Sequence, residues 1–218
     1  MIFKKGRRAD SIRQHLVTHT NPDSAISDQF RTIRSNIAFL TAEKQKKVFL
    51  ITSSSTGEGK STTTANLAVS MSGQKERILV IDANIRKPAL HYIFTLQNEL
   101  GLSDVLTNKA TLKETICQTD IGKLDILPSG STLYNPAELF GNEAMKQLLI
   151  EVKETYDVIL IDSPTVLQST ETRLLANLCD RVILVVNRGK TMIENAMEAR
   201  RILELSQADL MGTIMNEK

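Results

Sequence analysis

The sequence predicts an α/β fold with a mainly parallel sheet that is covered by helices on both faces. Short apolar runs of strand length alternate along the chain with longer segments in which apolar residues recur at three- and four-residue steps. The strand-like runs are apolar at almost every position, which is typical of a sheet buried on both faces. Regular alternation of this kind favours right-handed β–α–β crossovers and therefore a parallel sheet.

The expected elements follow one another along almost the whole chain. Strands are expected at 46–51, 77–82, 124–128, 158–162, 182–186 and 210–215, and helices at 27–40, 60–72, 101–106, 112–117, 136–152, 171–178 and 193–205. Residues 1–24 show no sustained periodicity and contain the turn signal Asn21-Pro22-Asp23, so they are expected to form a flexible N-terminal arm. Residues 25–218 are then expected to form a single domain.

The net charge, the cysteine content and the lengths of the apolar runs limit the kind of protein this chain can be. A net charge of +2 over 218 residues argues against a nucleic-acid partner. The two cysteines are far apart and belong to no metal-binding cluster, which indicates a reducing, cytoplasmic setting. No apolar run approaches the 18 residues or so that a membrane-spanning helix needs.

A phosphate-binding loop is predicted between the first strand and the helix after it. The apolar run 48–51 leads into Ser53-Ser54-Ser55-Thr56-Gly57-Glu58-Gly59-Lys60-Ser61. Glycines allow successive backbone N–H groups to surround phosphate oxygens, and the helix N-terminus adds its positive dipole end. Lys60 is expected to reach the β- and γ-phosphates and Ser61 to bind Mg²⁺. The pattern G-x-x-x-x-G-K-[ST] is missed only at its first position, where the chain has Ser54.

Aspartates close two of the buried strands. Asp162 ends the run 158–161, as a Walker B aspartate does, and Asp82 ends the second strand in the same way. Ligands of open α/β sheets bind at the carboxyl ends of the strands. Capping of the following turn is a purely structural explanation for either aspartate alone. Two of them beside a phosphate loop favour phosphoryl transfer, which requires the phosphates to be held and their charge neutralised.

Several segments carry motifs of one known family. The segment Ile81-Asp82-Ala83-Asn84-Ile85-Arg86-Lys87-Pro88 is followed by Asn135-Pro136-Ala137-Glu138-Leu139 and Asp162-Ser163-Pro164, and preceded by the helix 28–37. These segments resemble motifs of the bacterial tyrosine kinases (BY-kinases), which accompany capsule and exopolysaccharide export. Residues 81–88 resemble the family's second Walker A-like motif, I-D-x-D-x-R-x-P, and residues 135–139 resemble its N-P-x-E-L segment. Residues 162–164 resemble its D-[ST]-P-P Walker B motif, and the helix 28–37 resembles its E-x-x-R-x-x-R helix. The resemblance runs from about Ser27 to Asn216, nearly the whole chain.

The resemblance implies a P-loop NTPase-like fold and an ATP- and Mg²⁺-dependent protein-tyrosine kinase. It assigns catalysis to Lys60, Asp82, Asp162 and Arg86, with Asp82 orienting the acceptor hydroxyl and taking its proton late in the transfer. It implies that the nucleotide is bound by Ser55, Thr56, Gly57, Glu58, Gly59, Lys60, Ser61, Thr62, Asn84 and Asn216, and Mg²⁺ by Ser61, Asp82 and Asp162. Asn216 aligns with an asparagine that recognises the adenine base in related ATPases. The helix that bears Asp28, Arg31 and Arg34 is expected to contact a neighbouring subunit of a homo-oligomer.

The resemblance also implies partners. A kinase of this length in the family pairs with a membrane-anchored modulator protein of a polysaccharide export system, and it phosphorylates tyrosine-bearing proteins that regulate exopolysaccharide or capsule synthesis. The chain is therefore expected in the cytoplasm, recruited to the inner face of the cell membrane by that partner.

Some positions depart from the family pattern. Asn84 stands where a second acidic residue is usual, which removes one negative charge near the metal and is expected to lower metal affinity or rate. Glu171 stands where an aspartate is expected. The tyrosine-rich segment that ends the family's chains has no counterpart before Lys218, and the tyrosines present, Tyr92, Tyr134 and Tyr156, are scattered. Either such a tail is missing from the sequence or other proteins are the substrates.

Two alternatives stay open at this point. A MinD/ParA-type ATPase would have the same topology, but these proteins carry a lysine early in the phosphate loop, where this chain has Ser55. A catalytically weakened nucleotide-binding scaffold is the other alternative, and Asn84 together with the missing tyrosine segment favours it.

Overall fold

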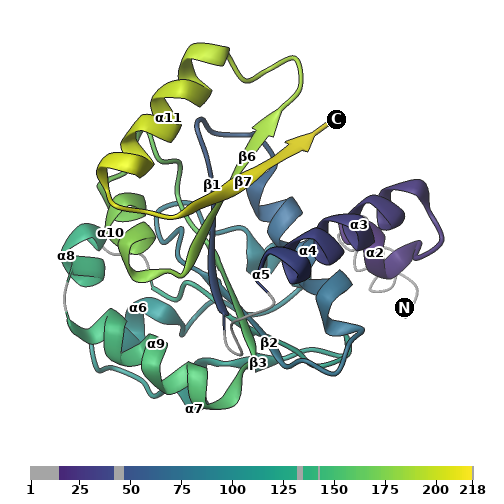
Figure 1. The fold of residues 1–218 in the computed structure, drawn as a ribbon. Helices are drawn as coiled ribbons and strands as arrows, with labels where there is room; N and C mark the ends of the chain where they lie inside the picture. Colours follow the sequence, from purple (N-terminus) through teal and green to yellow (C-terminus); the bar gives the residue numbers. More distant parts are fainter. Residues whose placement is uncertain (1–14, 42–46, 132–134, 142, 218) are drawn as a thin grey trace, which may run out of the picture.

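A mainly parallel sheet lies at the centre of the computed structural model, which describes residues 15–41, 47–131, 135–141 and 143–217. Within these ranges the strand order is β3-β4-β2-β5-β1-β6-β7 (Figure 1). The only antiparallel pair in that sheet is β3 with β4. The strands are β1 Lys47–Ser53, β2 Ile78–Asp82, β3 Cys117–Gln118, β4 Leu124–Leu127, β5 Val158–Asp162, β6 Arg181–Asn187 and β7 Leu210–Asn216. The α/β fold and the mainly parallel sheet predicted from the sequence are confirmed.

Helices cover both faces of the sheet. They are α2 Val17–Thr20, α3 Ala25–Leu40, α4 Lys60–Ser72, α5 Leu90–Phe94, α6 Leu102–Leu106, α7 Leu112–Thr115, α8 Pro136–Gly141, α9 Glu143–Thr155, α10 Thr170–Leu178 and α11 Ile193–Leu205. Figure 1 shows α2 to α5 on one side of the sheet and α6 to α11 on the other.

Two hydrophobic cores result from this layering. Successive strand residues point to opposite faces, so Val48 and Leu50 of β1 join the core under α6 to α11, whereas Phe49 and Ile51 join the core under α3 to α5. Each of these four side chains is at most 1% exposed. Burial on both faces explains why the strands read as continuous apolar runs in the sequence.

The segment before α3 differs from the flexible arm expected for residues 1–24. Residues 1–14 lie outside the described part of the chain, but Leu16 is buried in the core on the α4 side. The Thr18 backbone N–H and hydroxyl both donate to Asn66 Oδ1 on α4, at 3.0 Å. The Ser24 hydroxyl caps α3 by accepting from the Ser27 N–H. Leu16 and Thr18 therefore hold this segment against the domain, whereas residues 20–23 are exposed.

Two local expectations also need correction. The helix expected at 112–117 ends at Thr115, because Cys117 and Gln118 pair with Ile126 and Asp125 at the sheet edge. The short helix α5 was not expected, and the carboxylate of Asp82 binds the backbone N–H of Leu90, its first residue.

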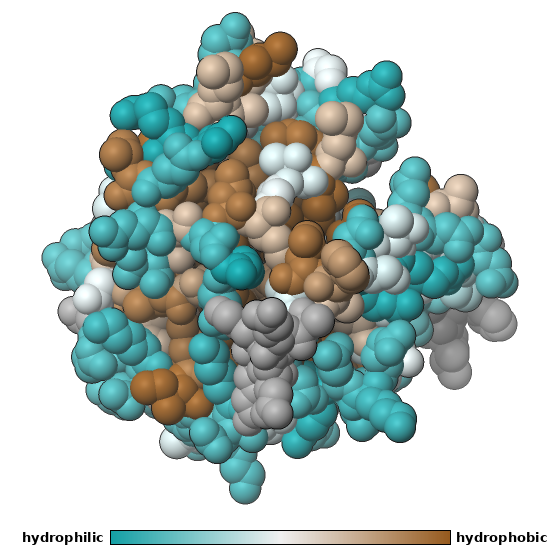
Figure 2. All heavy atoms as spheres, in the orientation of Figure 1, coloured by the Kyte–Doolittle hydropathy of each residue, from teal (hydrophilic) through white to brown (hydrophobic). Residues whose placement is uncertain are grey.

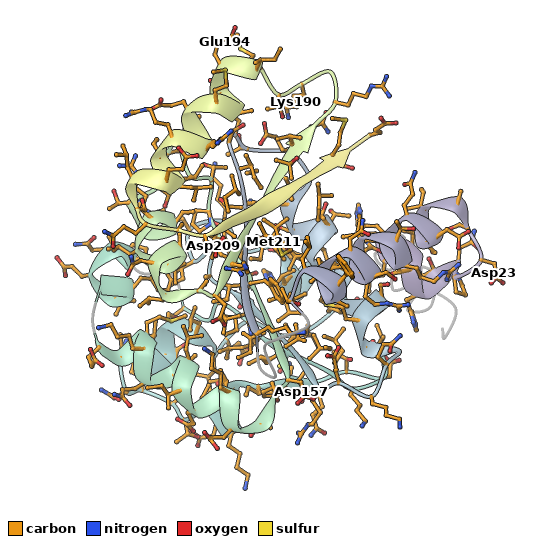
Figure 3. The ribbon with its side chains drawn as sticks, viewed as in Figure 1. Asp23, Asp157, Lys190, Glu194, Asp209 and Met211 are labelled. Carbon is orange, nitrogen blue, oxygen red and sulfur yellow. The ribbon has the colours of Figure 1, made fainter. Side chains whose placement is uncertain are left out.

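The surface near the sheet edge is partly apolar. Figure 2 shows apolar atoms gathered in the middle of one face, and Figure 3 places Met211 there. A groove of about 190 Å³ lies between α3 and the β6–β7 edge, lined in part by Ile33, Ile37, Met211 and Ile214. None of the helices within the described ranges is both long enough and apolar enough to cross a membrane.

Candidate active site

The predicted phosphate loop connects β1 to α4 at the carboxyl edge of the sheet. Gly57 and Gly59 have positive φ angles of 76° and 89°, a conformation that side chains other than that of glycine rarely adopt. A Cβ atom on Gly59 would lie only 2.2 Å from Asn216 Nδ2, and one on Gly57 would lie 2.6 Å from Lys190 Nζ. Backbone conformation therefore favours glycine at both positions, and at Gly59 the Asn216 side chain also leaves little room for a Cβ atom.

Ser54 explains how the loop tolerates the missing first glycine. Ser54 is not among the described residues with positive φ, so a glycine is not needed at this position. Its buried hydroxyl donates to the carboxylate of Glu58, 2.8 Å from Oε1. The departure from the strict motif thus adds a contact within the loop.

Asp82 and Asp162 lie side by side on neighbouring strands. They are register partners at the ends of β2 and β5, and both are fully buried. Asp82 accepts hydrogen bonds from three backbone N–H groups, those of Asn84 at 3.1 Å and of Ala89 and Leu90 at 3.0 Å. These bonds fix the Asp82 carboxylate in place.

Asp162 has fewer hydrogen bonds than Asp82. Neither of its carboxylate oxygens has a hydrogen-bond partner within ordinary geometry. Burial raises its pKa, and this is opposed by the positive charge of Lys60 and by the Ser61 hydroxyl nearby. For Asp82, burial and the neighbouring charge of Asp162 raise the pKa to about 7 in spite of the three backbone hydrogen bonds. Buried carboxylates without partners are costly, and such groups are usually paired or bind a metal ion.

This arrangement fits Mg²⁺ bound together with a phosphorylated ligand. Mg²⁺ prefers oxygen ligands, and in phosphoryl-transfer sites it takes one or two carboxylates plus phosphate oxygens and water rather than a full protein cage. Within the described ranges no group of three or more His, Cys, Asp or Glu residues could hold a metal. The two aspartates and the Ser61 hydroxyl are the donor set that a magnesium nucleotide would complete.

Two further predicted residues lie after β2. Asn84 is buried, and its backbone N–H binds Asp82. The Arg86 guanidinium forms an ion pair with Glu171 Oε1, at 3.1 Å from Nε and 2.8 Å from Nη2. Hydrogen bonds from Ser169 and Arg86 lower the pKa of Glu171, although burial opposes them. Arg86 is thereby anchored to the start of α10, with the rest of its side chain exposed.

The connection from β6 to α11 covers the phosphate loop from the outside, which the sequence did not reveal. The Lys190 ammonium lies 3.3 Å from the Gly57 carbonyl oxygen, and Asn216 Nδ2 donates to the Glu58 carbonyl oxygen at 3.1 Å. Figure 3 shows Lys190 on this connection, near Glu194 at the start of α11. Asn216 was predicted as a nucleotide-binding residue, whereas nothing in the sequence singled out Lys190.

The three residues expected at a subunit contact lie on α3, away from the phosphate loop. Arg31 forms an ion pair with Asp28 at 2.5 Å and donates to the Pro22 carbonyl oxygen. Arg34 donates to the Ser70 carbonyl oxygen of α4. All three side chains are at least partly accessible, so the subunit contact stays a prediction.

A cavity of about 610 Å³ lies away from the phosphate loop. Its lining includes Arg77, Asp125 and Tyr156, which lie near the amino ends of the strands. Because the phosphate loop and both aspartates lie at the carboxyl ends, this cavity does not belong to the site.

The chain was compared with protein families and with curated proteins. An AAA domain family matches residues 46–204. The tyrosine-protein kinase YwqD of Bacillus subtilis (strain 168) is 40% identical over 218 residues, which is all of this chain and 92% of that protein.

Solved structures point in the same direction. The kinase domain of the Escherichia coli tyrosine kinase ETK has a TM-score of 0.90 and 26% identity, covering 93% of this chain and 79% of that chain. The septum site-determining protein MinD from Pyrococcus horikoshii OT3, solved with Mg-ADP, is more distant, with a TM-score of 0.67, 26% identity and coverage of 78% and 70%. The P-loop NTPase-like fold is thus confirmed, and the interpretation as a tyrosine kinase is favoured over the interpretation as a MinD/ParA-type ATPase. The chain belongs to the family of bacterial tyrosine-protein kinases.

Proposed function

We propose that this protein transfers the γ-phosphoryl group of MgATP to tyrosine hydroxyls of protein substrates. The observation that carries the proposal is the buried carboxylate pair. Asp82 and Asp162 lie beside the phosphate loop, and the oxygens of Asp162 have no hydrogen-bond partner within ordinary geometry, with Lys60 and the Ser61 hydroxyl as the nearby groups that offset its charge. Such a pair destabilises the empty fold, and it is explained if a divalent cation and a polyphosphate occupy the space next to it.

The phosphate loop would hold the nucleotide. In this assignment the backbone N–H groups of residues 55–62 surround the phosphates, Lys60 neutralises the β- and γ-phosphates, and Ser61 shares Mg²⁺ with the two aspartates. When bound, Mg²⁺ supplies charge neutralisation at the transferring group. Asn216 lies beside Gly59 and Glu58 of the phosphate loop, and this position supports its assignment to the nucleotide.

Asp82 would orient the acceptor hydroxyl and accept its proton. A tyrosine hydroxyl ordinarily titrates near 10, so a carboxylate near 4 is a weak base for it. Burial and Asp162 bring the pKa of Asp82 to about 7 before any cation binds, which narrows this gap. Because a bound cation lowers that pKa again, transfer of the proton late in the reaction remains the consistent assignment.

Arg86 and Asn84 would complete the site. Arg86 is held by Glu171 at the rim and can interact with a phosphate or with a substrate carboxylate through its exposed N–H groups. Asn84 would contact nucleotide or metal-bound water as a neutral group, so the site contains one charge fewer than the family pattern.

Membrane recruitment is part of the same proposal. A membrane-anchored modulator of a polysaccharide export system would activate the chain at the inner face of the cell membrane. Asp28, Arg31 and Arg34 would contact a neighbouring subunit in a homo-oligomer. Capsule or exopolysaccharide synthesis would be the regulated process.

One assay tests the function. Purified protein is incubated with ATP, Mg²⁺ and the cytoplasmic segment of a candidate modulator, and phosphotyrosine and free phosphate are both measured. We expect phosphotyrosine, reduced roughly 100-fold or more by Lys60→Met because a principal charge contact to the transferring group is lost. Phosphate release without phosphotyrosine would support a MinD/ParA-type ATPase, and nucleotide binding with neither product would support a scaffold.

A further inference from the structure

We propose that Glu58 is a positioning residue that fastens the phosphate loop to the β6–α11 connection and so prepares both for nucleotide. Its side chain does not face the phosphate space. It is 1% exposed and takes part in a buried cluster with Ser54, Ser55 and Thr191, which we call the Glu58 clamp. The inference rests on nucleotide binding at the phosphate loop.

The clamp joins two segments that are far apart in the sequence. Glu58 Oε1 accepts from the Thr191 hydroxyl at 2.5 Å, and Oε2 accepts from the Ser55 backbone N–H at 3.0 Å. The Ser54 hydroxyl donates between the two oxygens, at 2.8 and 3.1 Å. One carboxylate thus holds both the start of the phosphate loop and the connection that covers it.

The direction of these hydrogen bonds requires an acceptor at position 58. The Thr191 hydroxyl accepts the Asn187 N–H at 2.8 Å, so its own proton is free to point at Glu58. Ser55 contributes a backbone N–H, which can only donate. A glutamine would place an NH₂ group against one of these donors, and an aspartate would be too short by one methylene to span the cluster.

Two other contacts hold the phosphate loop, one from the β6–α11 connection and one from the end of β7. Lys190 donates to the Gly57 carbonyl oxygen, and Asn216 donates to the Glu58 carbonyl oxygen. Both use backbone acceptors of the loop, whereas the clamp uses the only buried side chain among residues 55–61. When Glu58 is fixed, the N–H groups of the loop are aimed before phosphates arrive, and the β6–α11 connection lies at the position where it flanks the ligand. Pre-aimed groups lose less entropy on binding, which increases affinity.

The test compares variants of the full chain by their dissociation constants for MgADP, measured by titration calorimetry without any turnover. Thr191→Val removes the hydroxyl that crosses between segments but leaves the loop's own residues unchanged, and Thr191→Ser restores the hydroxyl. Thr107→Val is the matched control, because Thr107 caps the end of α6 and its hydroxyl donates locally, to the Ser103 carbonyl oxygen. Glu58→Gln and the double variant that carries both Glu58→Gln and Thr191→Val complete a double-mutant cycle.

We expect Thr191→Val and Glu58→Gln each to weaken MgADP binding by about 10- to 100-fold, which is the usual effect of losing a hydrogen bond to a charged group. Thr191→Ser should recover most of the loss, and Thr107→Val should bind like the unchanged protein. The double variant should bind no more weakly than the weaker single variant. In the kinase assay the loss for Thr191→Val should appear in KM for ATP and leave kcat within about twofold.

Three results would overturn the inference. These are unchanged MgADP binding in Thr191→Val, losses that multiply in the double variant, and a loss confined to kcat. If Thr191→Val fails to fold, as judged by its thermal unfolding next to Thr107→Val, then Thr191→Ser and Glu58→Gln decide the question. Failure of the unchanged protein to bind MgADP would instead contradict the proposed function and leave the clamp contacts unexplained.

Discussion

Replacing Asp162 by asparagine should make the protein more stable in the absence of Mg²⁺ and nucleotide. Ionisation of Asp82 in the folded protein is opposed by burial and by Asp162, which raise its pKa from 3.8 to about 7. At about 1.4 kcal/mol per pKa unit, the charged form costs the fold roughly 4 kcal/mol. Asp162→Asn removes one of those two causes together with the desolvation of Asp162 itself. We therefore expect the free energy of unfolding at about pH 8 to rise by about 2–4 kcal/mol.

The pH dependence distinguishes this explanation from general stabilisation. Because the folded-state pKa of both aspartates lies above the unfolded-state value, the folded protein holds more protons than the unfolded chain between about pH 4 and 7. The free energy of unfolding of the unchanged protein should therefore fall as the pH rises through that window. In Asp162→Asn the fall should be much smaller, and near pH 4 the two proteins should agree to about 1 kcal/mol.

The measurement is urea unfolding in EDTA at several pH values. Asp28→Asn is the control, because that side chain is 67% exposed and its ion pair with Arg31 is a surface contact, worth at most about 0.5 kcal/mol. Saturating MgADP should reverse the order of stability, since the unchanged protein gains binding energy that the variant largely lacks. Parallel stability curves for Asp162→Asn and the unchanged protein across this pH range would refute the electrostatic argument.

Three further predictions concern single substitutions. Gly59→Ala should lower the free energy of unfolding by about 1–3 kcal/mol through backbone strain, measured by thermal unfolding, whereas Gly73→Ala should change it by at most about 1 kcal/mol because nothing lies within 4 Å of the new Cβ. Asn84→Asp should raise the affinity for Mg²⁺ in the presence of ADP several-fold through the added charge, and equal calorimetric affinities would contradict this role. Arg86→Ala should cost about 1 kcal/mol near pH 7, since the ion pair with Glu171 is half exposed, and this cost should shrink as acid protonates Glu171 below its ordinary pKa range; a cost of the same size in a Glu171→Gln background would rule out the ion pair as its source.

The fold and the two aspartates could be predicted because both follow from local patterns. A run such as 158–162 is apolar at every position but its last, so the strand, its burial and the aspartate at its carboxyl end can all be predicted from these five residues. Parallel strands then place their carboxyl ends at one edge, and the pairing of β2 with β5, which the structure shows, brings Asp82 beside Asp162.

Other features depend on contacts between distant segments and have no local signal. Leu16 and Val17 form only a short apolar pair in a polar stretch, so periodicity could not show that Leu16 is buried and that Thr18 binds α4. Thr191 follows a glycine turn and looks like an ordinary loop residue, yet it binds Glu58 133 positions earlier. Glu58 itself was predicted as a phosphate-loop member, but its side chain points into the protein, a direction that sequence spacing does not determine.

Of the two carboxylates in the site, Asp82 is held by backbone hydrogen bonds and Asp162 is not, and this difference indicates a separate role for each. Asp82 is held by three backbone N–H groups, of which those of Ala89 and Leu90 lie at the start of α5, so we expect its position to change little when ligands bind. Asp162 has no such support, and only Lys60 and Ser61, both from the phosphate loop and α4, offset its charge. Any ligand that reorganises the phosphate loop must consequently change the environment of Asp162 first. The charge of Asp162 in turn sets the pKa of Asp82, so loading of the loop is coupled electrostatically to the residue that would accept the proton.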